Sequence, residues 1–250
     1  MKINRIDTKD IKDKQLNVIC FGDWHSGSHE CDIEKVQKQI DWIKEHKNNT
    51  KVILMGDLMD IGLKHSIGAG TFDNNLNPQE QFDTIVNMLE PIQDCIVGAH
   101  IGNHEMRLYN DTSINIIKNL CKALKIPYLD SGALHHIRFG NNTYIIYTTH
   151  GATGSTSPQG KLGSVLRLRD VAEADVYAMG HVHDLITYSQ EYMKPSLKDK
   201  TLITRKRYYT TTGHYLSYGG YAAAKNYAPG KSGCAKIILS SGKWDVHVSI

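Results

Sequence analysis

The sequence contains no long apolar stretch. No apolar run approaches the roughly 20 residues that a helix needs to cross a bilayer, and residues 1–15 are polar and charged. We therefore expect a soluble, cytoplasmic protein with no membrane partner.

Cysteine is scarce, and neither sign of charge dominates. The five cysteines are odd in number and show no Cys-x-x-Cys spacing, which favours free thiols in a reducing compartment over a disulfide framework. The 29 Lys and Arg residues nearly balance the 26 Asp and Glu residues, and the formal net charge is +3. Composition alone therefore does not indicate a nucleic-acid partner. Because 250 residues with 40% hydrophobic side chains can bury a sizeable core, we predict a single domain over residues 1–250.

Strand-like and helix-like segments alternate in the first half of the chain. Short apolar runs predict buried strands, and each is followed by a segment with apolar residues at helical spacing. The predicted strands cover residues 16–21, 51–55 and 95–101, and the predicted helices cover residues 32–47, 78–89 and a segment that includes Ile114, Ile117, Leu120 and Leu124. This alternation is typical of an α/β sheet.

Shorter strands dominate from Ala133 onwards. Residues 136–139 and 143–149 predict a hairpin around Gly140-Asn141-Asn142, where we expect the two asparagines to supply positive φ angles. Further segments predict a helix at 161–173 and strands at 175–179, 185–190, 201–211, 235–240 and 244–249. We expect the second half to form a second sheet.

Five short motifs place candidate metal-binding side chains directly after apolar runs. They are Gly22-Asp23-Trp24-His25, Gly56-Asp57, Gly102-Asn103-His104-Glu105, His150-Gly151 and Gly180-His181-Val182-His183. Because each follows a predicted strand, these side chains should meet at one edge of a sheet. Asp23 and His25 are two residues apart, so in an extended chain they point the same way. Mixed oxygen and nitrogen ligands suit Mn, Fe or Zn better than Ca or Mg.

Together these motifs resemble the signature of the calcineurin-like metallophosphoesterase family. The resemblance extends from residue 18 to residue 183, and the Gly-His-Val-His run is similar to the phosphodiesterase and nuclease branches. It implies two divalent ions about 3.5 to 4 Å apart, which activate a bridging water or hydroxide for in-line attack on phosphorus. Mn is our first choice for these ions, with Fe, Zn or Ni as alternatives.

The resemblance also implies a ligand set and a fold. It assigns Asp23, His25 and His183 to the first metal, Asp57 to a bridging position, and Asn103, His150 and His181 to the second metal. Together with the pattern of strands and helices, it predicts an α/β fold class, an α+β sandwich. In this fold two mixed β-sheets pack face to face, helices flank them, and the binuclear metal site lies at the strand ends.

Two further residues match catalytic positions of the family. His104 resembles the histidine that protonates the leaving oxygen or stabilises the charge developing there. Asp60 matches the residue that orients this histidine, although a carboxylate at a helix start is an alternative. Glu105 fits either a residue that supports the site or an exposed acid. Arg107, one helical turn after His104, fits either a contact to substrate phosphate or a solvated side chain.

Three segments have an open role. Residues 62–77 and 151–160 are rich in Gly, Ser, Thr and Asn and each follows a motif, so they could shape substrate access or be ordinary surface loops. Residues 208–227 carry six tyrosines among glycines, after a basic stretch. These tyrosines could stack bases while the basic residues hold phosphates, or they could be half-buried strand residues.

The function we expect is hydrolysis of phosphate esters by a two-metal phosphodiesterase, with a nucleotide or nucleic acid as the substrate. The alternatives are a phosphomonoesterase, acting on small molecules or proteins, and a non-catalytic scaffold with a phosphoesterase fold. The chain departs from protein phosphatases at Ser26 and at Met59-Asp60-Ile61-Gly62, where those enzymes carry Asp-Arg-Gly. The complete ligand set and His104 argue against a scaffold.

Overall fold

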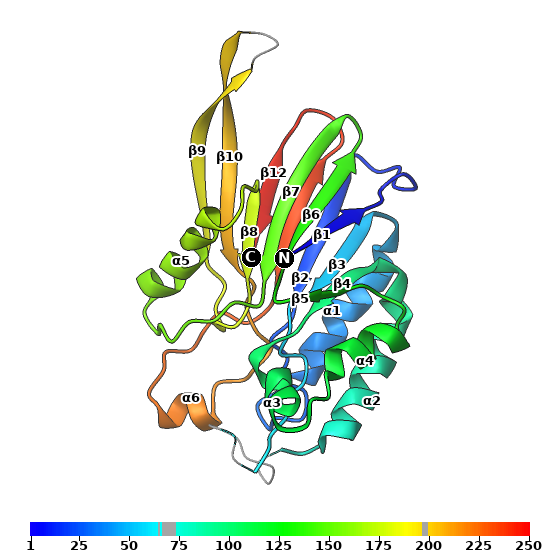
Figure 1. The fold of residues 1–250 in the computed structure, drawn as a ribbon, viewed down its shortest axis with the longest axis vertical. Helices are drawn as coiled ribbons and strands as arrows, with labels where there is room; N and C mark the ends of the chain where they lie inside the picture. Colours follow the sequence, from blue (N-terminus) through cyan, green and yellow to red (C-terminus); the bar gives the residue numbers. More distant parts are fainter. Residues whose placement is uncertain (65, 67–73, 197–199) are drawn as a thin grey trace.

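The computed structural model describes residues 1–64, 66, 74–196 and 200–250, which form two six-stranded mixed sheets (Figure 1). Sheet A has the strand order β1 (Lys2–Ile6), β6 (Gly132–Phe139), β7 (Asn142–Thr149), β8 (Val176–Met179), β10 (Thr201–Thr211) and β9 (Thr187–Ser196). Sheet B has the order β12 (Val246–Ser249), β11 (Ala235–Ser240), β2 (Gln15–Phe21), β3 (Thr50–Leu54), β4 (Ile96–His100) and β5 (Tyr128–Asp130).

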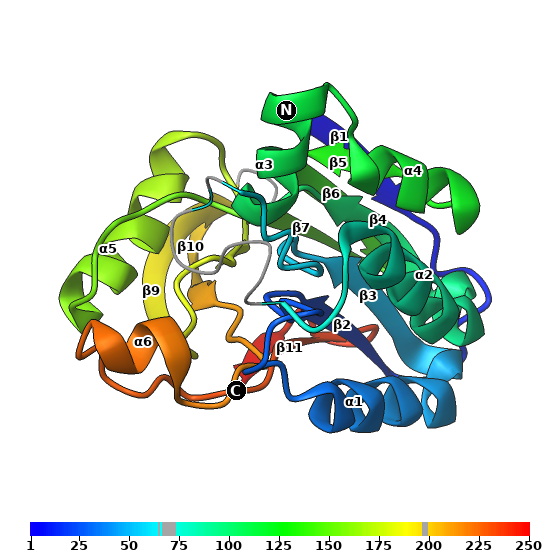
Figure 2. The same ribbon diagram turned by 90° about the horizontal axis from the view of Figure 1, so that it is seen from below.

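Helices cover the outer faces of both sheets (Figure 2). The helices beside sheet B are α1 (Ile33–Glu45), α2 (Pro78–Leu89) and α4 (Ile116–Ala123), and α5 (Pro158–Leu166) lies beside sheet A. The short helices α3 (Asn103–Thr112) and α6 (Gly220–Ala224) follow strand ends, and 3-10 turns occupy Lys47–Asn49, Glu90–Cys95 and Arg167–Asp170. This arrangement confirms the predicted fold class.

Period-2 alternation in the strands divides the core into layers. In β2, Val18 and Cys20 point into an apolar cluster between the two sheets, whereas Ile19 and Phe21 join a second cluster under the helices. A third cluster, which includes Val165 of α5, covers the outer face of sheet A. Because sheet B is buried on both faces, its central strands read as continuous apolar runs.

The division of the strands between the sheets differs from the expectation. The C-terminal strand β11 pairs antiparallel with β2, with Ala235 opposite Cys20, so β11 and β12 complete sheet B rather than the second sheet. The polar N-terminal segment, for which we expected no strand, forms β1 and pairs parallel with β6. Local periodicity identifies a strand but does not specify a partner that is distant in sequence.

Three local expectations also need correction. The helix expected after the third motif is two helices, because Ser113 adopts a left-handed conformation with φ of 61° and ends α3. In the β6–β7 hairpin the positive φ belongs to Gly140, at 59°, and not to the asparagines. The helix expected at 161–173 begins earlier, at Pro158, and continues into a 3-10 turn.

Among the described residues, no helix is both long and apolar enough to cross a membrane. All five cysteines have free thiols, as we expected.

Candidate metal centre

The motif residues meet where the carboxyl ends of strands from both sheets come together. Asp23, Asp57 and Asn103 follow β2, β3 and β4 of sheet B. His150, His181 and His183 follow β7 and β8 of sheet A. The centre therefore lies across the two sheets rather than at one sheet edge.

The backbone at these positions is unusual. Left-handed φ angles occur at Asp23 (53°), His25 (52°), Asp57 (48°), His181 (70°) and His183 (49°). The extended geometry that we expected for Asp23 and His25 is therefore wrong. Non-glycine residues adopt such angles at a cost on the order of 1–3 kcal/mol each, and they concentrate at functional sites.

One group of donor atoms gathers around Asp23. The donor atoms of Asp23, His25, Asp57 and His183 lie within 4.8 Å of one another. His183 Nε2 is 3.4 Å from Asp23 Oδ1, and His25 Nε2 is 3.0 Å from His183 Nε2. Two carboxylates and two imidazoles thus face one small space.

A second group shares Asp57 with the first. Donor atoms of Asp57, His150 and His181 lie within 4.8 Å of one another, and His150 Nε2 is 3.4 Å from Asp57 Oδ2. Asn103 Oδ1 completes the group, at 3.0 Å from His150 Nε2 and 2.6 Å from His181 Nδ1. The position of Asp57 between the two groups is the position that a bridging ligand requires.

The electrostatics of the centre fit bound cations. Asp23 Oδ2 and Asp57 Oδ2 are buried without a hydrogen-bond partner among the described residues, an arrangement that costs free energy unless a cation compensates it. Burial alone lowers the pKa of His150, but the Asp57 carboxylate raises it to about 10. The donor set favours bound positive charge, and its mixed oxygen and nitrogen atoms suit divalent transition metals.

His104 and Asp60 lie beside the centre and contact each other. His104 Nδ1 is 2.7 Å from the backbone oxygen of Asp60 and 3.0 Å from its Oδ1. The same Oδ1 is 3.1 Å from Nδ1 of His25. Burial lowers the pKa of His104, but the hydrogen bond to Asp60 and the charges of Asp57 and Asp60 together outweigh it and leave the pKa raised. Asp60 therefore contacts two histidines, whereas the family resemblance implied a contact with one.

Glu105 is an internal anchor rather than an exposed acid. Its carboxylate is fully buried and accepts hydrogen bonds from the backbone N–H groups of Asp57, Leu58, Met59 and Gly102. Burial, followed by the nearby Asp57 charge, raises the pKa of Glu105 to about 7, and the donated hydrogen bonds oppose this rise. The Glu105 side chain therefore links its own motif, Gly102-Asn103-His104-Glu105, to the Gly56-Asp57 motif through hydrogen bonds.

Arg107 points towards the centre. It donates from Nη1 to the backbone oxygen of Asp60 at 3.2 Å, and its Nη2 is 3.1 Å from Nε2 of His104. Because a guanidinium only donates, His104 Nε2 accepts in this arrangement and His104 Nδ1 carries a proton. Of the two interpretations of Arg107, a contact to substrate phosphate fits this position better than a solvated side chain.

His214, which no motif predicted, also belongs to the surroundings of the centre. It is buried, its ring centroid is 5.6 Å from that of His183, and its Nδ1 accepts from the N–H of Leu216. The following residue, Tyr215, donates its N–H to the oxygen of Asp23. The only sequence signal is a Thr-Gly-His run directly after β10, in which a glycine precedes the histidine as in Gly180-His181.

The centre opens into a cleft of about 1170 Å³. One wall is the segment 153–156, from the second loop that we expected over the site. Exposed Tyr218 and Tyr227 from the tyrosine-rich segment also line the cleft, whereas Tyr208, Tyr209 and Tyr215 are buried in the core. Of the expected loop 62–77, Leu63 and Ser66 line the cleft, and residues 65 and 67–73 lie outside the described residues.

Comparison with known proteins gives a family match. The profile described as calcineurin-like phosphoesterase matches residues 16–185. No curated protein sequence matches the chain. A similar solved structure is described as "GAP50 the anchor in the inner membrane complex of Plasmodium", with a TM-score of 0.45 and 12% sequence identity over 95% of this chain and 88% of that chain.

Proposed function

The chain belongs to the calcineurin-like phosphoesterase family, and on that basis we propose that it is a hydrolase that cleaves phosphate esters with two divalent ions. One observation supports this proposal above the others: Asp57 is shared by two groups of donor atoms, beside which His104 stands. Buried donor groups that share a carboxylate at a cleft floor are the arrangement that two-metal hydrolysis needs.

We assign the residues as follows. Asp23, His25 and His183 would hold one ion, Asn103, His150 and His181 the other, and Asp57 both. When bound, the ions would supply a more acidic water and neutralise charge on the phosphoryl oxygens. Mixed oxygen and nitrogen donors make Mn our proposed metal, with Fe, Zn or Ni as alternatives.

His104 would protonate the leaving oxygen. Asp60 occupies the Nδ1 side of the ring, so the transferred proton would come from Nε2 of a doubly protonated His104. The raised pKa of His104 favours that form, and the transfer requires Arg107 Nη2 to move away from Nε2. The N–H of His104 donates to Asp57 Oδ1 at 2.8 Å, which fixes the start of α3 against the centre. Arg107 then remains close enough to hold a phosphoryl oxygen.

The cleft favours a diester over a monoester. Its volume of about 1170 Å³ far exceeds the space for one phosphate, which leaves room for groups on both ester oxygens. Exposed Tyr218 and Tyr227 offer rings on which bases could stack, which supports a nucleotide or nucleic-acid substrate.

Comparison of two model substrates tests this proposal. We expect the Mn-loaded protein to hydrolyse bis-p-nitrophenyl phosphate faster than p-nitrophenyl phosphate, measured as kcat/KM from released p-nitrophenolate. A much faster monoester reaction would indicate a phosphomonoesterase instead. The absence of turnover of either ester with Mn, Fe, Zn or Ni would contradict the hydrolase assignment. It would favour the alternative hypothesis of a non-catalytic scaffold.

A further inference from the structure

Sheet A contains a gap at the end opposite the metal centre. Strand β8 begins at Val176, which pairs with Ile146 of β7 on one side and Tyr208 of β10 on the other. Both neighbours extend further in the same direction, and β10 continues with β9 as a long hairpin (Figure 1). The gap between them forms a pocket of about 450 Å³, which we call the β7–β10 slot, and it shares no lining residue with the metal cleft.

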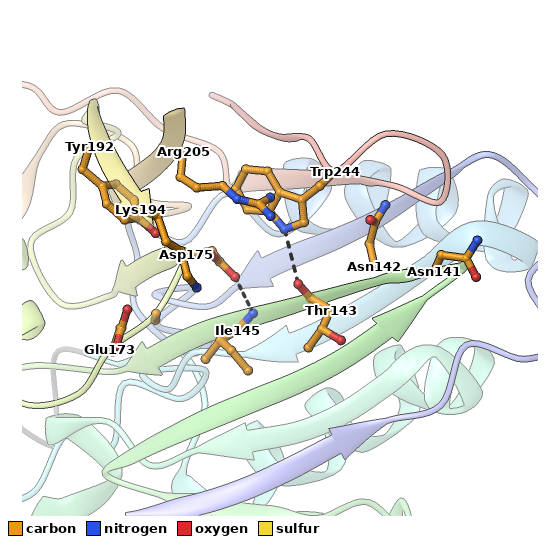
Figure 3. A pocket seen from close by; sticks show the side chains of 11 residues that line it. Asn141, Asn142, Thr143, Ile145, Glu173, Asp175, Tyr192, Lys194, Arg205 and Trp244 are labelled. Atoms are coloured by element: carbon orange, nitrogen blue, oxygen red, sulfur yellow. Dashed lines mark hydrogen bonds between the residues drawn. The ribbon is translucent and has the colours of Figure 1, made fainter. Parts of the chain in front are cut away.

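Two cations in the slot form no ion pair with the described residues. Arg205 of β10 and Lys194 of β9 both line it (Figure 3), and neither side chain makes a hydrogen bond within the described part of the chain, although Asp175 lies close enough for both charges to act on it. Their neighbour Arg207 differs, because it donates to the oxygen of Ala174 and lies 3.9 Å from Glu173. Unpaired cations that converge on a concave site favour an anionic ligand.

Arg205 is held in place before any ligand arrives. Its Cζ lies 4.1 Å from the ring centroid of Trp244 (Figure 3). Trp244 is itself fixed, because its Nε1 donates to the oxygen of Thr143 at 3.3 Å and its ring stacks on Tyr144. A guanidinium that rests on a fixed aromatic ring loses little freedom on binding an anion.

The base of the slot offers an acceptor. Asp175 Oδ2 accepts the N–H of Ile145 at 2.8 Å, and no hydrogen bond from the described residues engages its other oxygen. Phosphate oxygens alone would not use this acceptor, whereas a hydroxyl group would. The slot thus combines donors for an anion with an acceptor for a hydroxyl.

We propose that the β7–β10 slot binds a phosphate ester that carries hydroxyl groups, such as a sugar phosphate or a nucleotide. Lys194 and Arg205 hold the phosphate, and Asp175 accepts from a hydroxyl group. The volume suits a ligand of this size. The same chemistry occurs in a free small molecule and in the phosphorylated 5′ end of a nucleic-acid strand.

Titration followed by NMR tests the proposal at the slot itself. The indole N–H signal of Trp244 is the reporter, because ligands at the metal centre lie at the other end of β8. We expect this signal to shift saturably with ribose 5-phosphate, and with inorganic phosphate at higher concentration. We also titrate a 5′-phosphorylated oligothymidylate. If it saturates the signal at a lower concentration than ribose 5-phosphate does, the ligand is the 5′ end of a nucleic-acid strand. If ribose 5-phosphate saturates the signal first, the ligand is a free small molecule.

Three substitutions that each remove one positive charge test whether binding depends on the slot or on general surface charge. Arg205→Gln and Lys194→Gln should each weaken binding about tenfold or more, whereas Lys206→Gln, on the opposite face of the same strand, should change it less than about twofold. Asp175→Asn keeps an oxygen for the N–H of Ile145, so it should retain phosphate binding and lose the added affinity of ribose 5-phosphate. The absence of a saturable shift, or equal affinity in Arg205→Gln and Lys206→Gln, would overturn the proposal.

Discussion

At the scale of single residues, the hydrogen bonds around Asp60 and Glu105 decide how the centre is held. Asp60 lies between His25 and His104, so one carboxylate links a proposed metal ligand to the proposed acid. Glu105 fixes the backbone that presents Asp57. Neither carboxylate is a proposed metal ligand. Each supports the centre by holding the residues that it hydrogen-bonds in position.

His104→Ala tests the acid at this scale. We expect kcat to fall about 100-fold or more, because positioned proton transfer typically contributes 10² to 10⁴. The fall should be smaller for a p-nitrophenyl ester than for an alkyl ester, whose more basic leaving oxygen needs the proton more. Metal content, measured by mass spectrometry, should stay unchanged.

The control for this variant is His136→Ala, a histidine on β6 outside the centre. It should keep full activity on both esters. Equal losses for the two leaving groups in His104→Ala would contradict proton donation by His104 and would point to a role in stabilising charge.

The sequence revealed the donor residues but not how they are supported. Each donor stands in a short motif directly after an apolar run, so the pattern can be recognised from neighbouring residues in the sequence. The role of Glu105 depends on N–H groups from a different motif, and His214 reaches the centre only because β10 runs beside β8. Such contacts arise from tertiary pairing, which periodicity does not encode.

At the scale of elements, a buried polar network joins β4, β6 and β7. His100 Nε2 and His135 Nε2 each lie 2.7 Å from Oγ1 of Thr148. Burial lowers the pKa of His100 to about 4 and that of His135 to about 3. Both imidazoles are therefore neutral in the folded protein near neutral pH.

This network predicts a loss of stability in acid. Near about pH 5 the unfolded chain protonates His135, whose ordinary pKa is 6.5, but the folded protein does not, so the unfolding free energy falls as pH is lowered. His135→Asn should reduce this slope by up to about 1.4 kcal/mol per pH unit. Urea unfolding in EDTA between about pH 6.5 and 4.5 measures it.

His136→Asn is the matched control, because its side chain lies on the other face of β6. Its slope should equal that of the unaltered protein. A slope that does not change in His135→Asn would show that this histidine becomes protonated without unfolding.

At the scale of the whole molecule, the centre connects the two sheets. Its proposed ligands divide between strands of sheet A and strands of sheet B, and Asp57 of sheet B is 3.4 Å from His150 of sheet A. Ions bound here would link the two layers of the sandwich directly. Most element types and their order were predictable from periodicity, but strand β1 and the membership of β11 and β12 in sheet B were not.

We therefore expect metal binding to raise the Tm. An ion at about 100 times its Kd stabilises the folded state by about 2.7 kcal/mol, so Mn added to EDTA-treated protein should raise the Tm in calorimetry. Asp57→Asn should abolish most of the rise, because both donor groups share this residue. Asp41→Asn, an exposed carboxylate on α1, should keep the full rise. An undiminished rise in Asp57→Asn would place the bound metal elsewhere.

The left-handed backbone at five of the proposed ligands has a consequence for metal supply. We expect folding itself to set these angles at Asp23, His25, Asp57, His181 and His183, so that the free energy of ion binding is not consumed in shaping the loops. Any divalent ion that accepts this set of donors would then enter without rearranging the chain. The ion found in the protein would then follow its availability in the cell, and the same polypeptide could change its reactivity when that availability changes.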